Sequence, residues 1–262
     1  MIRALYTAAS GMSAQQANLD TVANNLANSA TTGFRQRALN FEDMIYQNLV
    51  TPGAAESTST ASAGLQIGLG TKSVASEVIM TQGDFTQTGN TLDLAIQGTG
   101  FFPISMPDGT TAYTRDGSFH LNNQGMMVTA DGNPLVPNIT IPANAPPVTI
   151  SQYGVVSATL PGQTTSTQFG TIQLATFANA GGLTALGSNL FQQTFASGNA
   201  ITDVPGGTSG MGTLQQGYTE NSNVDVTAAF VQMIVAQRAY ESNSKVAHVA
   251  DDMYSQINGL VR

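Results

Sequence analysis

The sequence predicts an α+β protein in which two long terminal helices flank an inserted, twisted antiparallel β domain. Three observations carry this prediction. Apolar side chains recur at helical spacing near the N-terminus and again over the last 35 or so residues. Between about Lys72 and Gln216, short β-type runs such as LDLAI and TIQLATF alternate with turn residues. The helices are therefore expected at the ends of the chain and the β domain between them.

The N-terminal helix is predicted by a seam of residues whose spacing alternates between three and four. Polar residues from Asn28 to Thr32, followed by Gly33, supply the stop signals. We expect residues 1–32 to form the first helix of a terminal coiled-coil domain. Its seam comprises Ile2, Leu5, Ala9, Met12, Gln16, Leu19, Ala23 and Leu26.

The C-terminal helix is predicted to start near Ser222 and Asp225, which have the spacing of a capping box with Asp in place of Glu. No Pro or Gly interrupts the sequence beyond them before Gly259. Residues 217–262 are thus expected to be a connector and the second helix. Its apolar stripe has a mean spacing near 3.6 and comprises Ala228, Val231, Val235, Ala239, Ser242, Val246, Val249, Met253, Ile257 and Leu260.

The sequence between the helices divides into an arm and a β domain. Residues 33–71 are expected to form an extended connecting arm, because TPGAAESTSTASAG (51–64) has the small, polar composition of a loop. Residues 72–216 are expected to form the outer β domain. Turns are predicted there at Asp108-Gly109, Asp116-Gly117 and Asp131-Gly132.

Charge is scarce, and this excludes several functions. Only 9% of residues are charged, the net charge is -8, and the eight basic residues are scattered, so nucleic acid is not an expected partner. Residues 132–202 carry no charged side chain. That segment is either a soluble β surface built from Thr, Ser, Asn and Gln, or a surface that lies against other protein, because interface cores are depleted in charge.

No cofactor, metal or membrane insertion is expected. The chain has no cysteine, so thiolate metal sites and disulfides are excluded. No stretch approaches the roughly 20 apolar residues that span a bilayer. Polar residues such as Thr7, Ser10 and Gln15 interrupt any signal-peptide core.

Catalysis is also not expected. The two histidines, His120 and His248, belong to no metal-binding or catalytic motif. The three Asp-Gly pairs could supply paired carboxylates of a glycosidase, but turn chemistry explains each of them. Gly98 and Gly100 match two thirds of a dinucleotide fingerprint and lack the following helix, so a tight β turn is preferred. A glycan-binding β domain on helical oligomerisation arms remains as a non-enzyme alternative.

The N-terminal helix is poorly supported by a single partner helix. Its five large seam side chains contribute roughly 1.5–3 kcal/mol each when fully buried. Ordering about 30 residues costs ~1–2 kcal/mol each, which helical hydrogen bonds offset only in part. Packing the termini of several copies together resolves the deficit, and a head-to-tail contact that does not close produces a helical filament. A coiled-coil dimer is the alternative.

Four motifs, in order along the chain, resemble those of bacterial flagellar rod and hook proteins. ANNLANSATTGFRQ (23–36) resembles their N-terminal signature, and QRAYESNSKV (237–246) resembles its C-terminal counterpart. DLAIQGTGFFPI (93–104) and YTRDGSFHLNNQG (113–125) resemble the signature of their β domain. The resemblance covers both termini and much of the first half of the β domain, and is weak over 137–212. The chain is identified as a member of this axial protein family.

Within the family, chain length and the segment from about 46 to 64 favour the distal rod branch, with proximal rod and hook-type proteins as alternatives. The resemblance implies a structural subunit that polymerises helically into a drive shaft and transmits torque from motor to hook. It implies contacts with other copies, proximal rod proteins, the hook protein, the P and L ring proteins and the flagellar type III export apparatus. It also implies a location across the periplasm after export without a cleaved signal peptide.

Two sets of residues are expected to serve this role. The rod-specific segment is marked by Tyr46, Pro52, Gly53 and Gly64. The expected packing residues between subunits are Ile2, Leu5, Met12, Leu19, Asn24, Asn25, Leu26, Asn28, Val231, Val235, Arg238, Tyr240, Val246, Val249, Met253 and Leu260. For the asparagines, we expect side-chain amides that hydrogen-bond to neighbouring helices.

Overall fold

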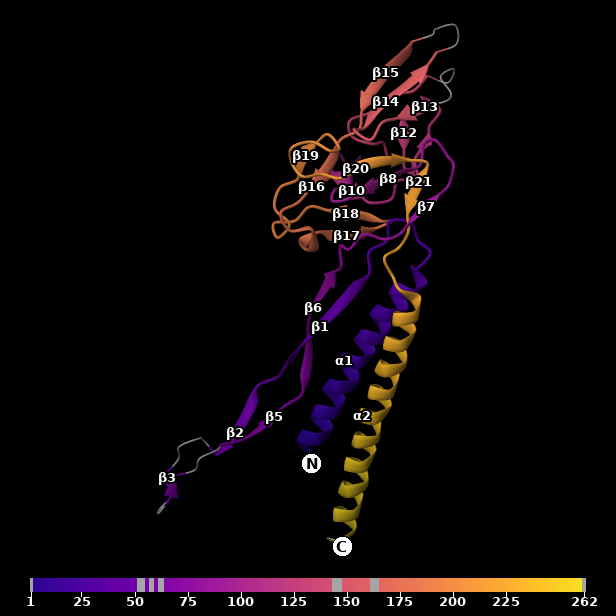
Figure 1. Ribbon diagram of the computed structural model, residues 1–262. Helices are drawn as coiled ribbons and strands as arrows, with labels where there is room; N and C mark the ends of the chain where they lie inside the picture. Colours follow the sequence, from indigo (N-terminus) through magenta and orange to yellow (C-terminus); the bar gives the residue numbers. More distant parts are fainter. Residues whose placement is uncertain are drawn as a thin grey trace. The chain divides into compact units, whose positions relative to one another are not determined.

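The computed structural model describes residues 2–50, 55–56, 59–60, 64–142, 148–160 and 165–260 (Figure 1). The chain divides into two units. The helical unit comprises residues 1–27, 37–77 and 225–262, and the β unit comprises residues 28–36 and 78–224. Terminal helices with a β-rich region between them confirm the α+β class.

Both predicted helices are present, and their ends have local causes. Helix α1 spans Ile2–Ala27. A turn follows it, in which the backbone N–H of Thr31 donates to the carbonyl of Asn28. Helix α2 spans Val226–Leu260 and begins where Oδ1 of Asp225 accepts the N–H groups of Thr227 (2.8 Å) and Ala228 (3.1 Å). Asp225 is therefore the N-cap, which corrects the expected capping box starting at Ser222.

Small side chains form the contact between α1 and α2 within the helical unit. The two helices pack against each other. On α2, Ala229, Ala236 and Ala250 are buried, and Asn243 lies where a Cβ on Gly11 of α1 would be only 2.7 Å from its Nδ2. These four α2 positions recur every seven residues, as in a coiled coil. The intrachain helix contact thus uses a different face of α2 from the predicted apolar stripe.

The arm of the helical unit is a β ribbon. Strand β1 (Arg37–Asp43) pairs with β6 (Thr71–Val78), and β2 (Tyr46–Val50) pairs antiparallel with β5 (Leu65–Gly68). Strand β3 (Ala55–Glu56) pairs antiparallel with β4 (Ser59–Thr60). Because β6 extends the pairing beyond the expected arm, the units divide after residue 77 rather than at residue 72.

The arm is attached to α1 by side-chain hydrogen bonds. The amide of Asn25 donates to the carbonyl of Arg37 (2.8 Å) and accepts its N–H (2.9 Å). Oγ of Ser10 accepts the N–H of Thr71, next to Gly70, whose φ of 120° brings the backbone close to the helix. These contacts order the start of β1 and β6 along α1.

The β unit is built from short strands. A four-stranded sheet has the order β17-β18-β10-β9, a three-stranded sheet has the order β13-β14-β15, and two-stranded pairs join β8 with β20, β7 with β21, β16 with β19 and β11 with β12. These pairings are antiparallel. The strands are β7 (Phe85–Gln87), β8 (Leu94–Gln97), β9 (Phe102–Ser105), β10 (Thr111–Thr114), β11 (His120–Leu121), β12 (Met127–Val128), β13 (Val148–Ile150), β14 (Val155–Thr159), β15 (Ser166–Thr171), β16 (Leu174–Thr176), β17 (Thr184–Gly187), β18 (Leu190–Gln192), β19 (Ile201–Asp203), β20 (Thr213–Gln216) and β21 (Tyr218–Glu220), with a short 3-10 helix η1 (Ala180–Gly182).

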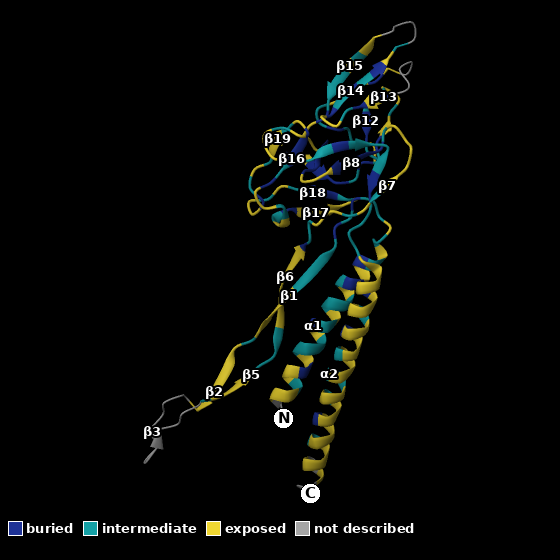
Figure 2. Ribbon diagram, in the orientation of Figure 1, coloured by how far each residue is buried: buried dark blue, intermediate teal, exposed yellow. Residues whose placement is uncertain are grey.

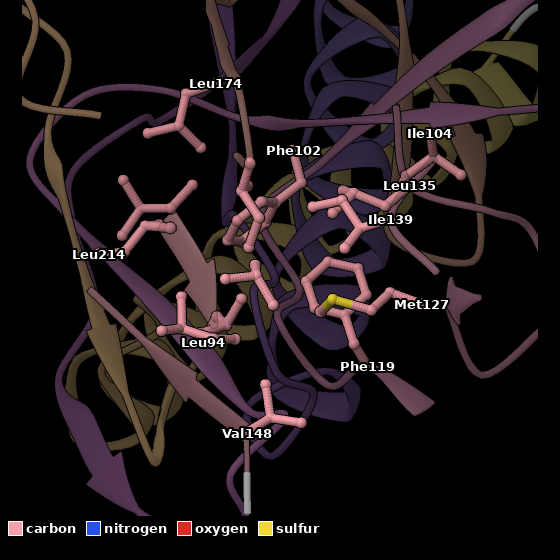
Figure 3. Close-up of a cluster of buried hydrophobic side chains, with 14 of the residues drawn as sticks. Leu94, Phe102, Ile104, Phe119, Met127, Leu135, Ile139, Val148, Leu174 and Leu214 are labelled. Atoms are coloured by element: carbon pink, nitrogen blue, oxygen red, sulfur yellow. The ribbon is translucent and has the colours of Figure 1, made fainter. Parts of the chain in front are cut away.

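Two apolar clusters hold the β unit together. The larger one includes Leu94, Phe102, Phe119 and Met127, all at most 1% exposed (Figure 3). Phe102 and Phe119 meet edge to face with ring centroids 5.1 Å apart. The smaller cluster is aromatic and contains Phe101, Tyr113, Phe177 and Phe191. Successive side chains of a strand point to opposite faces, so Phe101 and Phe102 serve different clusters.

The three Asp-Gly pairs do not share one role. Gly109 and Gly132 have φ near 83° and 85°, so the predicted turns at Asp108-Gly109 and Asp131-Gly132 are present. Gly117 has no positive φ, and a Cβ on it would lie 1.6 Å from the carbonyl oxygen of Leu94. The expected turn at Asp116-Gly117 differs from the other two: Oδ1 of Asp116 accepts the N–H of Ser118 (3.1 Å), and Gly117 serves a close approach of two backbone segments.

Candidate assembly surface and buried ion cluster

Helix α2 carries a row of large apolar side chains that are exposed in the described part of the chain. Figure 2 shows α2 exposed along most of its length. Val231, Val235 and Val249 are 57%, 61% and 53% exposed, and Val246 and Met253 are exposed to a similar degree. We call these five residues, together with Ile257, the α2 stripe. Exposed apolar side chains gathered on one helix face mark an interaction surface.

The seam of α1 is covered only in part. Leu5, Met12, Leu19 and Leu26 are half-buried, whereas Ala9, Gln16 and Ala23 are exposed. The side chains of Ile2 and Leu260, both expected packing residues, lie outside those that the structure describes. Among the described residues of a single chain, part of the predicted seam and the α2 stripe thus remain exposed.

The polar residues among the expected packing residues differ in their exposure and in their hydrogen-bond partners. Arg238 and Tyr240 lie exposed on α2, and Asn24 is exposed on α1. Asn28 is half-buried and accepts a hydrogen bond from Oγ1 of Thr31. Asn25 is buried, but its amide binds the backbone of Arg37 in its own chain. This corrects the expectation that its partner lies on a neighbouring helix.

Part of the expected rod-specific segment is described. Tyr46 is half exposed at the start of β2, opposite Gly68 of β5. Gly64 directly precedes β5. Pro52 and Gly53 lie outside the described residues. The β2–β5 ribbon exposes Leu49, Val50, Leu65 and Ile67.

A buried ion cluster ties together the segments of the β unit that continue into the helical unit. Glu220 is 1% exposed, and its carboxylate accepts Nη2 of Arg35 (2.6 Å), Nε of Arg115 (2.7 Å) and the N–H of Gly83 (2.9 Å). Its backbone carbonyl accepts the N–H of Gly33. The cluster therefore joins positions near residues 33, 83 and 220, with Arg115 from the interior of the unit.

Arg115 is held by a cradle of carbonyls. Its Nη1 donates to Gly100, and its Nη2 donates to Ile96 (2.9 Å) and Gly98. Gly98 and Gly100 have φ of 110° and 136°, which turns these carbonyls toward the guanidinium. Burial lowers the pKa of Arg115, and Arg35 lowers it further while Glu220 opposes the shift. A tight β turn was expected at the two glycines, and in the structure their carbonyls bind the side chain of Arg115.

Asn223 makes a second tie between the same segments. Its side-chain oxygen accepts the N–H of Gln36 (2.8 Å), and its Nδ2 donates to the carbonyls of Ile79 (2.9 Å) and Thr81 (3.0 Å). Sequence reasoning missed this residue and the ion cluster. A usable signal was present for the cluster, because Arg35 and Arg115 are rare charges inside two of the recognised motifs.

Among the described residues, no group of three or more His, Asp or Glu side chains could hold a metal ion. No helix within the described part of the chain is long and apolar enough to cross a membrane.

Comparison with known proteins decides the family. Models of the flagella basal body rod protein, the flagellar hook protein FlgE/F/G D1 domain and the flagellar basal body rod FlgEFG protein C-terminal match residues 5–35, 95–158 and 215–260. The flagellar basal-body rod protein FlgG of Caulobacter vibrioides is 48% identical over 99% of both chains, and that of Borreliella burgdorferi is 46% identical over the full length of both. The chain belongs to the FlgG family of flagellar basal-body rod proteins. This is a family of structural proteins rather than of enzymes.

Both ends of the chain fall within family models that are shared with other flagellar axial proteins. The FlgG relative from Bacillus subtilis is 40% identical over the full length of both chains, whereas the flagellar hook-basal body complex protein FlhP of the same organism is 28% identical. The rod and C-terminal models fall on α1 and α2, and the D1 model falls on the β unit. The α2 stripe therefore lies within a segment that FlgG proteins share with other rod and hook proteins.

Proposed function

We propose that this chain polymerises through its terminal helices into the distal rod of the flagellar basal body, where it transmits torque from motor to hook. The observation that supports this most directly is the uncovered α2 stripe. Each large apolar side chain contributes roughly 1.5–3 kcal/mol when fully buried, so covering the stripe with other copies supplies a substantial driving force. An assembly contact that does not close on itself then extends into a helical filament.

The helical geometry supports packing on more than one neighbour. The face of α2 that packs on α1 recurs every seven residues through Ala229, Ala236, Asn243 and Ala250. Val235 and Val249 are neither on this face nor covered by α1. A helix with two separate packing faces can contact α1 of its own chain and helices of other copies at once, as the wall of a coiled-coil tube requires.

The proposed partners follow from the proposed place in the flagellum. Copies of the chain form the shaft, with proximal rod proteins at one end, the hook protein at the other and the P and L ring proteins around it. The type III export apparatus delivers the subunit across the inner membrane to the periplasm. The ion cluster and Asn223 support the mechanical role, because they tie the segments that carry load between helices and β unit.

The test compares two aspartate substitutions on α2 in the full chain. Val235→Asp places a charge in the stripe, and Ser255→Asp places the same charge on an exposed position about 200° away around the helix, among polar neighbours. We expect Val235→Asp to abolish polymers in sedimentation and electron micrographs, because a buried unpaired charge is costly, while Ser255→Asp assembles.

Two results would oppose the proposal. Normal polymers from Val235→Asp would mean that the stripe is not an interface. A wild-type protein that forms only a discrete oligomer and binds glycans would favour a coiled-coil oligomer carrying a β binding domain.

A further inference from the structure

A partly open cavity of about 130 Å³ lies in the β unit, beside the ion cluster, with the exposed Gly98 and Thr99 on its wall. Both arginines of the cluster line it, together with the polar side chains of Gln82, Thr99 and Thr176 and the ring of Phe177. One water needs roughly 10–15 Å³ on the same measure, so the cavity has room for a small organic group. Its wall combines positive charge, hydroxyl and amide groups, and apolar surface.

The charges that face this cavity do not balance. Arg35 and Arg115 face the single carboxylate of Glu220, and the three side chains are at most 5% exposed. The cluster therefore carries a net charge of +1 in an environment where an uncompensated charge is costly. A monoanion would neutralise it.

One unpaired hydrogen-bond donor of the cluster indicates where a neutralising anion would bind. Arg115 donates through its Nε, Nη1 and Nη2, and both oxygens of Glu220 accept hydrogen bonds. Among the residues that the structure describes, Nη1 of Arg35 is the buried side-chain polar atom without a hydrogen-bond partner. Buried polar atoms in folded proteins are nearly always paired, so this atom points to an acceptor that the described residues do not supply.

We propose that this cavity binds one carboxylate group, which pairs with Arg35 and neutralises the ion cluster. A carboxylate suits a guanidinium because two parallel N–H···O bonds can form, and its single charge matches the excess. The aromatic and methyl-bearing wall accepts the short apolar stem to which such a group is attached. The carboxylate comes either from a small organic acid or from an acidic side chain of another copy in the polymer.

The first experiment uses the full-length monomer and acetate as the probe. The Nε–Hε signal of Arg35 is followed by ¹⁵N nuclear magnetic resonance while potassium acetate replaces potassium chloride at constant ionic strength. We expect a saturable shift of this signal and a matching rise in the thermal midpoint of the β unit, because a ligand that binds the folded state stabilises it. Neutral acetamide, which has nearly the same shape, should give neither effect.

Two variants serve as controls. Ala180→Met fills the cavity from its wall without changing a charged residue, and should abolish the acetate response while the signals of Arg115 persist. Thr176→Val removes one hydroxyl of the wall at constant shape and should weaken the response. A wild-type shift that is absent, does not saturate, or persists unchanged in Ala180→Met would overturn the proposal.

A second experiment finds the source of the carboxylate, and this one alone rests on the proposed assembly. Solid-state resonance of polymers prepared without organic acids should show the shifted Arg35 signal if a neighbouring copy provides the group. If the shift appears only after acetate is added, the source is a free acid. Absence of the shift under both conditions would contradict the proposal, whereas failure to polymerise would count against the proposed function and leave the monomer result standing.

Discussion

Removing the charge of Glu220 should destabilise the β unit more than any other single change of a carboxylate to its amide in the described chain. Glu220→Gln keeps the shape of the side chain but leaves Arg35 and Arg115 buried without a counter-charge. Breaking a buried ion pair by removing one partner costs about 3–5 kcal/mol. Here one carboxylate serves two guanidiniums and the N–H of Gly83, so the upper half of that range is expected.

Urea unfolding of the monomer, followed by near-ultraviolet circular dichroism, measures this loss. Tyr113 lies in the aromatic cluster of the β unit and reports on its packing. Glu77→Gln is the matched control, because Glu77 is exposed and the same chemical change there should alter the free energy of unfolding by less than about 0.5 kcal/mol. A loss below about 1 kcal/mol for Glu220→Gln, or a loss equal to that of the control, would refute the view that this cluster holds the β unit together.

Three further predictions test separate parts of the structure. Leu19→Asp should leave the β unit as stable as in the wild type but block assembly, because it places a charge in an apolar helix bundle. Normal shafts and normal swimming in a strain that carries this variant would exclude the α1 seam as an interface. Gly117→Ala should lower the free energy of unfolding in urea by about 3 kcal/mol or more, since its Cβ would lie 1.6 Å from the carbonyl oxygen of Leu94. Gly109→Ala should lower it by only ~1–2 kcal/mol, because no atom lies within 4 Å of its Cβ and only the positive φ is unfavourable. Equal losses for the two variants would refute the close approach at Gly117. Deleting residues 47–64 should give polymers that assemble but curve, because we expect this segment to lie along adjacent subunits and prevent them from sliding. Electron micrographs of rods as straight as wild type would reject this role.

The helices could be predicted from the sequence because their apolar periodicity is long and uninterrupted. The helix ends were less certain, since several polar residues could cap each one. Asp225 caps α2 because its side chain reaches two N–H groups, and Ser222, an equally good residue type, lies too early to do so. Local sequence identifies candidates for a cap, and the path of the chain decides among them.

The assignment of helix faces shows a different limit. Large apolar residues such as Val231 and Val249 determined which face of α2 was predicted to pack, and small members such as Ala239 only continued the spacing. The contact between α1 and α2 in one chain instead uses Ala236 and Gly11, which carry too little apolar surface to indicate a packing face by themselves. They matter because small side chains let two helices approach closely, which becomes visible only once both helices are placed.

The pairing within the ion cluster could not be predicted because its members are distant in sequence. Arg35 is a rare charge inside a recognised motif, but Glu220 lies 185 residues away, and nothing near Arg35 in the sequence indicates that partner. For Gly98 and Gly100, the local sequence predicted a tight turn. In the structure, their carbonyls accept hydrogen bonds from the side chain of Arg115. Such roles depend on a partner that local patterns do not contain.

The proposed interface is tested most directly by the accessibility of two serines of α2. The chain has no cysteine, so Ser242→Cys and Ser255→Cys each introduce a single thiol with little change in shape. Both positions are exposed in one chain, and they lie about 140° apart around the helix, with Ser242 in line with the α2 stripe. Labelling each variant with a thiol reagent before and after polymerisation should show strong protection at position 242 and much less at position 255. Equal labelling of position 242 in monomer and polymer would contradict the assignment of the α2 stripe as the contact between subunits.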